Sequence, residues 1–318
     1  MEFRKAEKRK AKLRLGITGP AGSGKTYGAL LIAKGLGGRI VMLDTENGSG
    51  DLYDGLCDYD IGEITAPYDV EKYIDGIHQA EKAGYNVVII DSLSHAWAGE
   101  GGLLDQQGKI ADSSRSGNSF AAWRQITPKH NKLIETMLNS PCHIIATMRS
   151  KTEYIQAENE RGRTEIRKVG MAPVQREGMD YEFGVVFDLN VSHMASVSKD
   201  RTSLFDGQVF KLSEDTGTAL KNWLETGIDL KERKTQLSQL WQRYLAVCDN
   251  QAEHAKNAMK AVTGKDNSST FTADDMKALF EDIQRREDEA MNAELKEDQQ
   301  DTEQTTDGNP VDVEPVMD

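Results

Sequence analysis

Residues 13–26 read LRLGITGPAGSGKT, and the part from Gly19 onward matches the pattern G-x-x-x-x-G-K-[ST]. The apolar run before the motif predicts a strand, and Thr26–Leu36 predicts a helix directly after it. Glycines permit the tight turn in which backbone N–H groups converge on phosphate oxygens, while the lysine reaches the β- and γ-phosphates and the threonine hydroxyl binds Mg²⁺. The motif therefore predicts a nucleotide and Mg²⁺ site formed by Gly19, Pro20, Ala21, Gly22, Ser23, Gly24, Lys25 and Thr26.

Two acidic residues at the ends of other apolar runs extend this site. Asp91 follows the predicted strand Val87–Ile90, where a carboxylate holds Mg²⁺, usually through water. Glu46 follows the predicted strand Arg39–Leu43. If these two strands are neighbours, Glu46 faces the γ-phosphate and can polarise the attacking water. The predicted metal ligands are thus Thr26 and Asp91, and the predicted catalytic base is Glu46.

The residues after Asp91 argue against two nucleotide-hydrolysing classes. The next residue is Ser92 and not Glu, which disfavours the AAA+ and helicase families that place a catalytic Glu there. Position 94 is Ser94, so no D-x-x-G follows and a Ras-type GTPase is also disfavoured.

Short apolar runs alternate with helical stretches between residues 12 and 189, which predicts an α/β fold with a mainly parallel central sheet flanked by helices. Residues 190–212 are expected to add antiparallel strands, while residues 99–119 and 150–178 are expected to form long loops. After residue 230 the apolar residues recur at helical spacing, which predicts a small C-terminal helical appendage. The other predicted strands and helices are His143–Thr147, Gly184–Leu189, Val70–Ala83 with Asp69 as its N-cap, and Ala121–Leu138 with a break at Pro128.

Charge is distributed unevenly along the 318 residues, whose formal net charge is −13. Seven Lys and Arg face two acidic residues in positions 1–14, whereas twelve acidic residues and one lysine occupy positions 287–318. The last segment is expected to be disordered. The predicted domains are a basic N-terminal arm (1–12), an ATPase-type core (13–227), a helical appendage (228–290) and a disordered acidic tail (291–318).

Cysteine content and hydropathy predict a cytoplasmic protein. Three scattered cysteines, Cys57, Cys142 and Cys248, argue against a disulfide framework. No run approaches the roughly 18 apolar residues that a membrane-spanning helix needs. The charged N-terminus is not typical of a secretory signal.

The chain resembles the RecA-like branch of P-loop ATPases through the loop Gly19–Thr26, the strand end Asp44-Thr45-Glu46 and the strand end Asp91-Ser92. The resemblance covers about residues 12–225 and implies hydrolysis of ATP with Mg²⁺ and with Glu46 as the base. Residues 172–183 are similar to short bacteriophage ATPases, core-only relatives of recombinases. Those proteins act in single-strand annealing and recombination beside a single-strand binding protein, which here implies the bacterial host cytoplasm.

The family keeps its two DNA-binding loops at positions that correspond to residues 99–119 and 154–178. Trp97, Phe120 and Trp123 flank the first loop and either stack on bases or belong to the core. The second loop is basic and either follows a phosphate backbone or is simply solvated. Its candidate contacts to single-stranded DNA are Arg161, Arg163, Arg167, Lys168 and Arg176.

Two features differ from the usual recombinase pattern, and a third concerns contacts between subunits. The polar sensor at the end of the strand before the second DNA loop is replaced by Thr147 or Arg149, and no polymerisation strand is evident. Lys199 and Arg201 resemble the Lys-x-Arg pair that reaches a neighbouring subunit's γ-phosphate in RecA-like hexamers. This resemblance implies a homo-oligomer, either a ring or a filament. The alternative is a solvated hairpin of mixed charge.

The first functional hypothesis is a DNA-dependent ATPase that acts on single-stranded DNA in recombination, annealing or repair. A replicative helicase or loader motor, and an ATP-binding mediator with little turnover, remain alternatives. A small-molecule kinase lacks support, because Glu46, Lys199 and Arg201 have no role in such an enzyme and no arginine-rich lid is evident.

Overall fold

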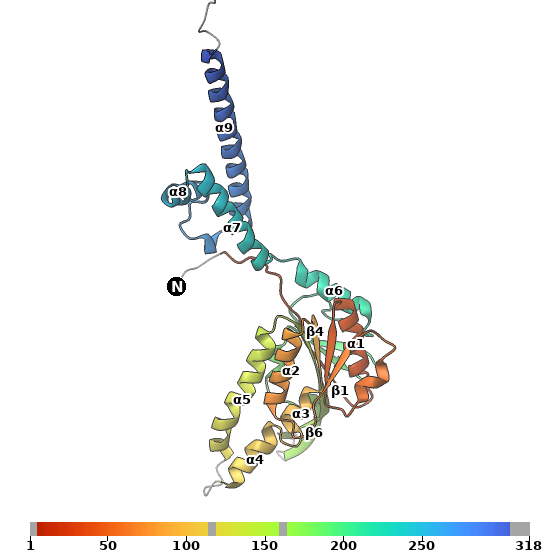
Figure 1. Cartoon of the computed structure of the whole chain (residues 1–318). Coiled ribbons are helices and arrows are strands. Elements are labelled where there is room, and N and C mark those ends of the chain that lie inside the picture. The colour runs from red at the N-terminus through yellow and green to blue at the C-terminus, as the bar shows by residue number, and fades with distance from the viewer. Residues whose placement is uncertain (1–4, 114–118, 159–163, 306–318) are drawn as a thin grey trace, which may run out of the picture. The chain divides into compact units, whose positions relative to one another are not determined.

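The computed structural model describes residues 5–113, 119–158 and 164–305 (Figure 1). Over residues 152–158 and 164–171 it describes the course of the backbone only. The chain divides into a core unit, residues 11–226, and a helical unit that joins residues 5–10 to the residues after 226.

The core unit is built on a nine-stranded sheet with the order β3-β2-β4-β5-β1-β7-β8-β9, in which β6 pairs with β5 alone. Neighbours from β3 to β7 are parallel, and β8, β9 and β6 are antiparallel additions. The expected α/β fold with a mainly parallel sheet is therefore confirmed. The strands are β1 (Arg14–Gly19), β2 (Ile40–Asp44), β3 (Asp60–Glu63), β4 (Val87–Asp91), β5 (His143–Glu158), β6 (Thr164–Pro173), β7 (Val185–Leu189), β8 (Ala195–Asp200) and β9 (Val209–Phe210).

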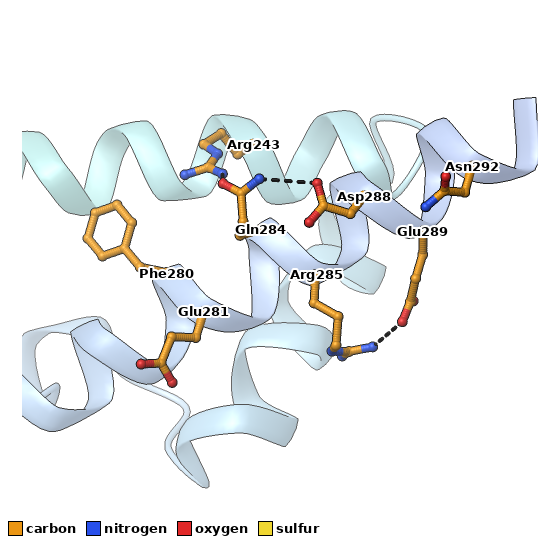
Figure 2. A pocket seen from close by; sticks show the side chains of 8 residues that line it. All are labelled: Arg243, Phe280, Glu281, Gln284, Arg285, Asp288, Glu289 and Asn292. Carbon is orange, nitrogen blue, oxygen red and sulfur yellow. Dashed lines mark hydrogen bonds and ion pairs between the residues drawn. The ribbon is translucent and has the colours of Figure 1, made fainter. Parts of the chain in front are cut away.

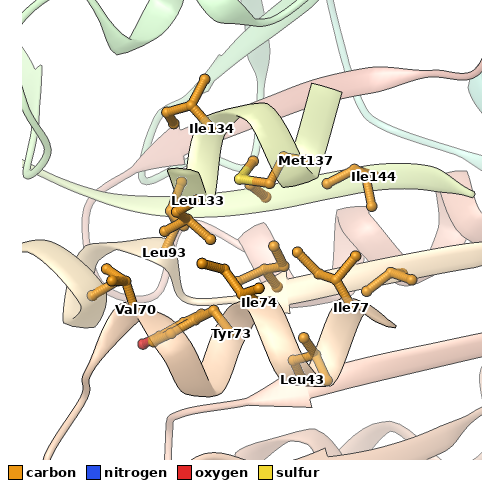
Figure 3. Packing of buried hydrophobic residues seen from close by; sticks show 14 of the residues in the cluster. Leu43, Val70, Tyr73, Ile74, Ile77, Leu93, Leu133, Ile134, Met137 and Ile144 are labelled. Atoms are coloured by element: carbon orange, nitrogen blue, oxygen red, sulfur yellow. The ribbon is translucent and has the colours of Figure 1, made fainter. Parts of the chain in front are cut away.

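Helices cover both faces of this sheet (Figure 1). On one face α1 (Lys25–Leu36) packs against α6 (Glu214–Glu225). Glycines on both helices allow this close approach, because a Cβ on Gly35 would lie 2.1 Å from the Glu214 carbonyl oxygen and one on Gly217 would lie 2.2 Å from that of Ile32. On the other face α2 (Val70–Lys82) and α5 (Ser119–Asn139) bury a shared apolar cluster, shown in Figure 3. Shorter segments link these helices: η1 (Ser49–Tyr53), α3 (Leu93–Ala98), α4 (Leu103–Ser113) and η2 (Met179–Glu182).

Both segments predicted to be long loops contain regular structure, so those predictions are wrong. Residues 103–113 form α4, which buries Leu103 against the core. Residues 150–158 and 164–173 pair as antiparallel strands, a hairpin in which Ser150 lies opposite Pro173 and Glu158 opposite Thr164. The predicted break at Pro128 is also wrong, since α5 is continuous. Burial of apolar side chains on both sides of the proline compensates for the one hydrogen bond that it removes.

The helical unit consists of α7 (Leu230–Val247), α8 (Ala252–Thr263), η3 (Ser268–Thr270) and α9 (Ala273–Thr305) around their own apolar cluster. α9 starts with reciprocal bonds, because Thr272 Oγ1 accepts from the Asp275 N–H at 3.2 Å and Asp275 Oδ2 accepts from the Thr272 N–H at 2.5 Å. Charged side chains line a cavity of about 660 Å³ beside α7 and α9, and they pair with one another, as Arg285 does with Glu289 (Figure 2).

Residues 5–10 of the predicted basic arm belong to the helical unit. Lys10 N–H donates to the Ile228 carbonyl at 3.0 Å, and Ile228 N–H donates to Lys8 at 2.9 Å. Glu7 supplies the anchor, since its carboxylate pairs with Arg233 at 3.0 Å and accepts from the Ala273 N–H at 3.0 Å. A single acidic residue thus fixes a segment whose net charge is positive.

α9 continues to Thr305, so the disordered tail predicted to begin at residue 291 does not match the structure over residues 291–305. Ten of the fifteen residues in this stretch are Glu, Gln, Met, Ala, Leu or Lys, which have high helix propensity. Residues 306–318 lie outside the described part of the chain. No helix within the described residues is long and apolar enough to cross a membrane.

Candidate functional site

The phosphate-binding loop connects β1 to α1, as its sequence predicts. Gly22 and Gly24 have φ values of 73° and 86°, which lie in the left-handed region that glycine adopts without strain. α1 then begins at Lys25, so its unpaired N–H groups and its positive dipole end lie at the loop. Lys25 Nζ donates to the Pro20 carbonyl across the loop at 2.9 Å. Burial lowers the pKa of Lys25, and the charges of Asp91 and Glu46 oppose this effect.

Asp91 is joined to the loop by the residue predicted to share its metal ion. Thr26 Oγ1 donates to Asp91 Oδ2 at 2.6 Å, and Thr147, which lies opposite Ile17 on β5, donates to the other carboxylate oxygen. This geometry arises because β5 lies between β1 and β4, which brings three carboxyl ends of strands together. Asp91 is 2% exposed, and this burial raises its pKa despite the two hydroxyl donors. A carboxylate beside a hydroxyl at a helix start is a donor set that suits Mg²⁺.

Glu46 lies at the same edge of the sheet because β2 and β4 are parallel neighbours, with Asp44 opposite Asp91. This adjacency is the condition on which its predicted role rests. The Glu46 carboxylate forms a bidentate ion pair with Arg149, in which Nε is 3.1 Å from Oε1 and one terminal nitrogen is 2.8 Å from each oxygen. Arg149 thus contacts the predicted base, whereas Thr147, the other sensor candidate, contacts Asp91.

Sequence reasoning missed the polar contacts that hold the ends of β2 and β4 together. Thr45 Oγ1 accepts from the Ser92 N–H at 2.8 Å and lies 2.6 Å from His95 Nδ1. The His95 ring stacks on Tyr68, with centroids 4.7 Å apart. Burial lowers the pKa of His95, and the nearby Arg149 lowers it further, which favours the neutral imidazole. Thr45 lies between two acidic residues in the sequence, which was the only available signal.

A cavity of about 590 Å³ opens beside the phosphate-binding loop. Tyr27 and Tyr53 line it, with ring centroids 6.3 Å apart, and His193 lies close to Gly24, since a Cβ on that glycine would be 3.3 Å from Nδ1. Its size and aromatic lining suit a nucleotide base. The position of Tyr27, directly after Thr26, could have indicated this pocket, but Tyr53 and His193 come from distant turns.

Comparison with known proteins gives a family for this arrangement. A family model described as an AAA domain matches residues 11–259, which include the whole core unit from its first residue. The chain belongs to this AAA domain family. No curated protein matches it. The family supports a P-loop domain that hydrolyses nucleotides. The argument from Ser92 concerned only the families that place a catalytic Glu directly after the metal-binding Asp, so it does not conflict with this match. The residue directly after Asp91 is Ser92, so this AAA domain has no acidic residue at that position.

The AAA domain does not bring Lys199 and Arg201 to its own phosphate-binding loop. β8 runs antiparallel to β7 and places Lys199 opposite Val186, toward the end of the sheet away from the loop. Lys199 Nζ donates to the Asp180 and Tyr181 carbonyls at 2.9 and 2.7 Å. β8 ends at Asp200, so the strand geometry expected to align the two cations does not extend to Arg201. Their action on a neighbouring subunit stays a prediction.

The five predicted DNA contacts are not gathered into one described surface. Arg161 and Arg163 lie outside the described residues, and Arg167 and Lys168 lie on β6, where only the backbone is described. Arg176 follows the hairpin, and its guanidinium carbon is 6.0 Å from the centroid of the Trp123 ring.

Proposed function

We propose that this AAA domain hydrolyses ATP with Mg²⁺ and acts on single-stranded DNA in recombination, annealing or repair. The observation that carries the ATPase assignment is the joint position of Lys25, the bonded pair Thr26–Asp91 and Glu46 at one edge of the sheet. The RecA-like resemblance supports the DNA substrate and a phage setting.

Each group has a distinct chemical task in this proposal. The loop N–H groups and Lys25 hold the β- and γ-phosphates and stabilise the charge that develops on them. Thr26 and Asp91 hold Mg²⁺, which neutralises phosphate charge when bound. Glu46 orients the attacking water and accepts its proton. The pocket between Tyr27 and Tyr53 receives the base of the nucleotide.

The Arg149–Glu46 ion pair favours a low basal rate. A carboxylate whose two oxygens both accept from a guanidinium has fewer free lone pairs to accept a proton from water. Hydrolysis therefore requires that Arg149 releases Glu46. This observation also supports the second candidate function, an ATP-binding mediator with little turnover.

The support for DNA binding comes from charge near the hairpin. Residues 161–176 contain five Lys and Arg against one Glu, although the whole chain is acidic. Arg149 is the last residue of β5 that pairs with β1, and the hairpin follows it. Its carbonyl accepts from the N–H of Val174, directly after the hairpin, at 2.6 Å. DNA on the hairpin would thus act on the residue that restrains Glu46. We further propose that the protein works as a homo-oligomer, ring or filament, beside a single-strand binding protein.

Steady-state ATP hydrolysis with and without single-stranded DNA, at one salt concentration, tests the proposal. Lys25→Ala provides the blank, and Glu46→Gln is expected to bind ATP with hydrolysis reduced to that blank. Stimulation by DNA supports the proposed substrate. Turnover that does not respond to DNA contradicts it and favours a motor with another activator. Turnover retained in Glu46→Gln removes Glu46 as the base.

A further inference from the structure

A groove with a volume of about 560 Å³ lies on the core unit, separate from the nucleotide pocket. Two indoles form its floor, and their rings are stacked with centroids 5.7 Å apart and planes inclined by 21°. Both indoles are half-buried and pack against the apolar cluster of α2 and α5. We call it the tryptophan groove, and its lining residues are Trp97, Trp123, Arg176, Glu177, Gly178 and Tyr181.

Exposed aromatic rings extend this surface beyond what the core requires. Tyr181 is 73% exposed, and Phe120 is 86% exposed one helical turn before Trp123. Residues three apart share a face of a helix, so Phe120 and Trp123 lie on the same side of α5. The groove therefore combines a buried aromatic floor with aromatic rings that face solvent.

Cations lie against these rings. The Arg176 guanidinium carbon is 6.0 Å from the centroid of Trp123, and Lys199 Nζ is 5.7 Å from that of Tyr181. Lys199 is held there by two backbone carbonyls, so its charge is fixed in place. Flat rings with adjacent fixed cations match the two components of a single-stranded nucleic acid, namely bases that stack and phosphates that carry charge. Glu177 is the one acidic side chain in the lining.

We propose that the tryptophan groove binds unpaired bases of single-stranded nucleic acid by stacking, an inference that rests on the proposed DNA-dependent function. Arg176 and Lys199 then contact the phosphates beside the stacked bases. The role of Lys199 follows from its position beside Tyr181 and is independent of any contact with a neighbouring subunit.

The groove is connected to the nucleotide site through two short segments. Trp97 lies on α3, which begins at Leu93, two residues after Asp91. Gln175, next to Arg176, donates from Nε2 to the Leu93 carbonyl at 3.3 Å. The Arg149 N–H donates to Ser94 Oγ in the same helix at 2.9 Å. A stacked base therefore contacts segments that also position Asp91 and Arg149.

Binding of two labelled oligonucleotides to the full chain, at one fixed salt concentration, tests this site. One is an oligothymidylate, and the other has the same length and phosphates but only abasic sugars. Stacking of one or more bases predicts roughly 5- to 150-fold tighter binding of the oligothymidylate, with quenching of tryptophan fluorescence. Tyr181→Ala and Trp123→Leu are expected to remove most of this preference. Trp223→Leu, which changes a half-buried indole on α6, is the matched control and is expected to retain it.

The outcomes separate the groove from the proposed function. Equal binding of both oligonucleotides overturns base stacking, while DNA binding stands. Binding of neither overturns both proposals. A base preference that persists in Tyr181→Ala places stacking elsewhere and overturns the groove. Tyr181 is largely exposed, so Tyr181→Ala is expected to fold. This variant tests the groove even if Trp123→Leu does not fold. A changed sedimentation coefficient of Tyr181→Ala with an unaltered base preference makes the groove a contact between copies of the chain, which also overturns it.

Discussion

Replacing Asp91 with asparagine is expected to stabilise the nucleotide-free core unit while abolishing Mg²⁺-dependent hydrolysis. Asp91 is almost fully buried, and burial is the largest influence on its carboxyl group, whose pKa it raises. The hydroxyl donors Thr26 and Thr147 oppose this effect but do not cancel it. The charged form that would hold Mg²⁺ is therefore unfavourable for folding, and the amide removes that charge at nearly constant shape.

The sign of the pH dependence follows from the raised pKa. The folded state holds this proton more tightly than the unfolded state, in which the pKa of Asp is about 3.9. The stability that Asp91 contributes is thus fully present below pH about 3.9 and is lost as pH rises through the folded pKa. Asparagine avoids that loss, because one threonine hydroxyl can still donate to the amide oxygen while the other rotates to accept from the amide N–H. We expect a gain of about 1–3 kcal/mol at neutral pH, which shrinks as the solution is acidified.

Thermal unfolding of the wild type and Asp91→Asn across pH 4–8 measures this effect. A domain of this size shifts by about 2–4 °C per kcal/mol, so the expected gain is several degrees at the alkaline end. Asp206→Asn is the matched control, because Asp206 is an exposed carboxyl group of the same unit and its replacement should change little. A lower melting temperature for Asp91→Asn at pH 8 would show that the hydroxyl donors outweigh burial. A gain independent of pH would refute the electrostatic explanation.

Three further predictions concern charged side chains. Arg149→Ala is expected to raise the rate of ATP hydrolysis without DNA by up to about fivefold, because a partly exposed bidentate ion pair contributes about 1 kcal/mol. A lower rate would show that the guanidinium binds a phosphate of the nucleotide. Arg201→Ala is expected to abolish turnover but not ATP binding, and retained turnover would remove its predicted contact with a neighbouring subunit. Glu7→Gln is expected to destabilise the helical unit by about 1–3 kcal/mol because it leaves the half-buried Arg233 without its charge partner. An unchanged Trp241 fluorescence transition in urea would contradict this.

The phosphate-binding loop and Asp91 could be predicted from sequence because both belong to contiguous motifs. The loop needs only its own glycines, and Asp91 needs only the apolar strand before it. Parallel strands then bring their carboxyl ends to one edge, whatever the loops between them do. The Arg149–Glu46 pair could not be predicted in this way, since it joins residues on either side of β4 and 103 positions apart in the chain.

The hairpin and α4 were missed for a different physical reason. β6 pairs with β5 alone, and its sequence has no apolar alternation but several charged residues, which are typical of a loop. α4 buries little more than Leu103, so its apolar pattern is equally weak. Sequence periodicity reports burial, and elements at the margin of a core carry little of that signal.

The position of Glu46 shows that the predicted base does not have to follow Asp91 directly in the sequence. The argument against families with a catalytic Glu directly after the metal-binding Asp concerns neighbours in sequence. The attacking water, however, is oriented by side chains that lie near it in space. β2 and β4 are parallel neighbours, and Asp44 lies opposite Asp91 at their carboxyl ends. Glu46 and Ser92 therefore both follow the same end of two adjacent strands. A carboxylate at either position can reach the same region above the phosphates. The AAA match and the resemblance to RecA-like ATPases are therefore compatible, because the same site geometry can take its catalytic carboxylate from either strand.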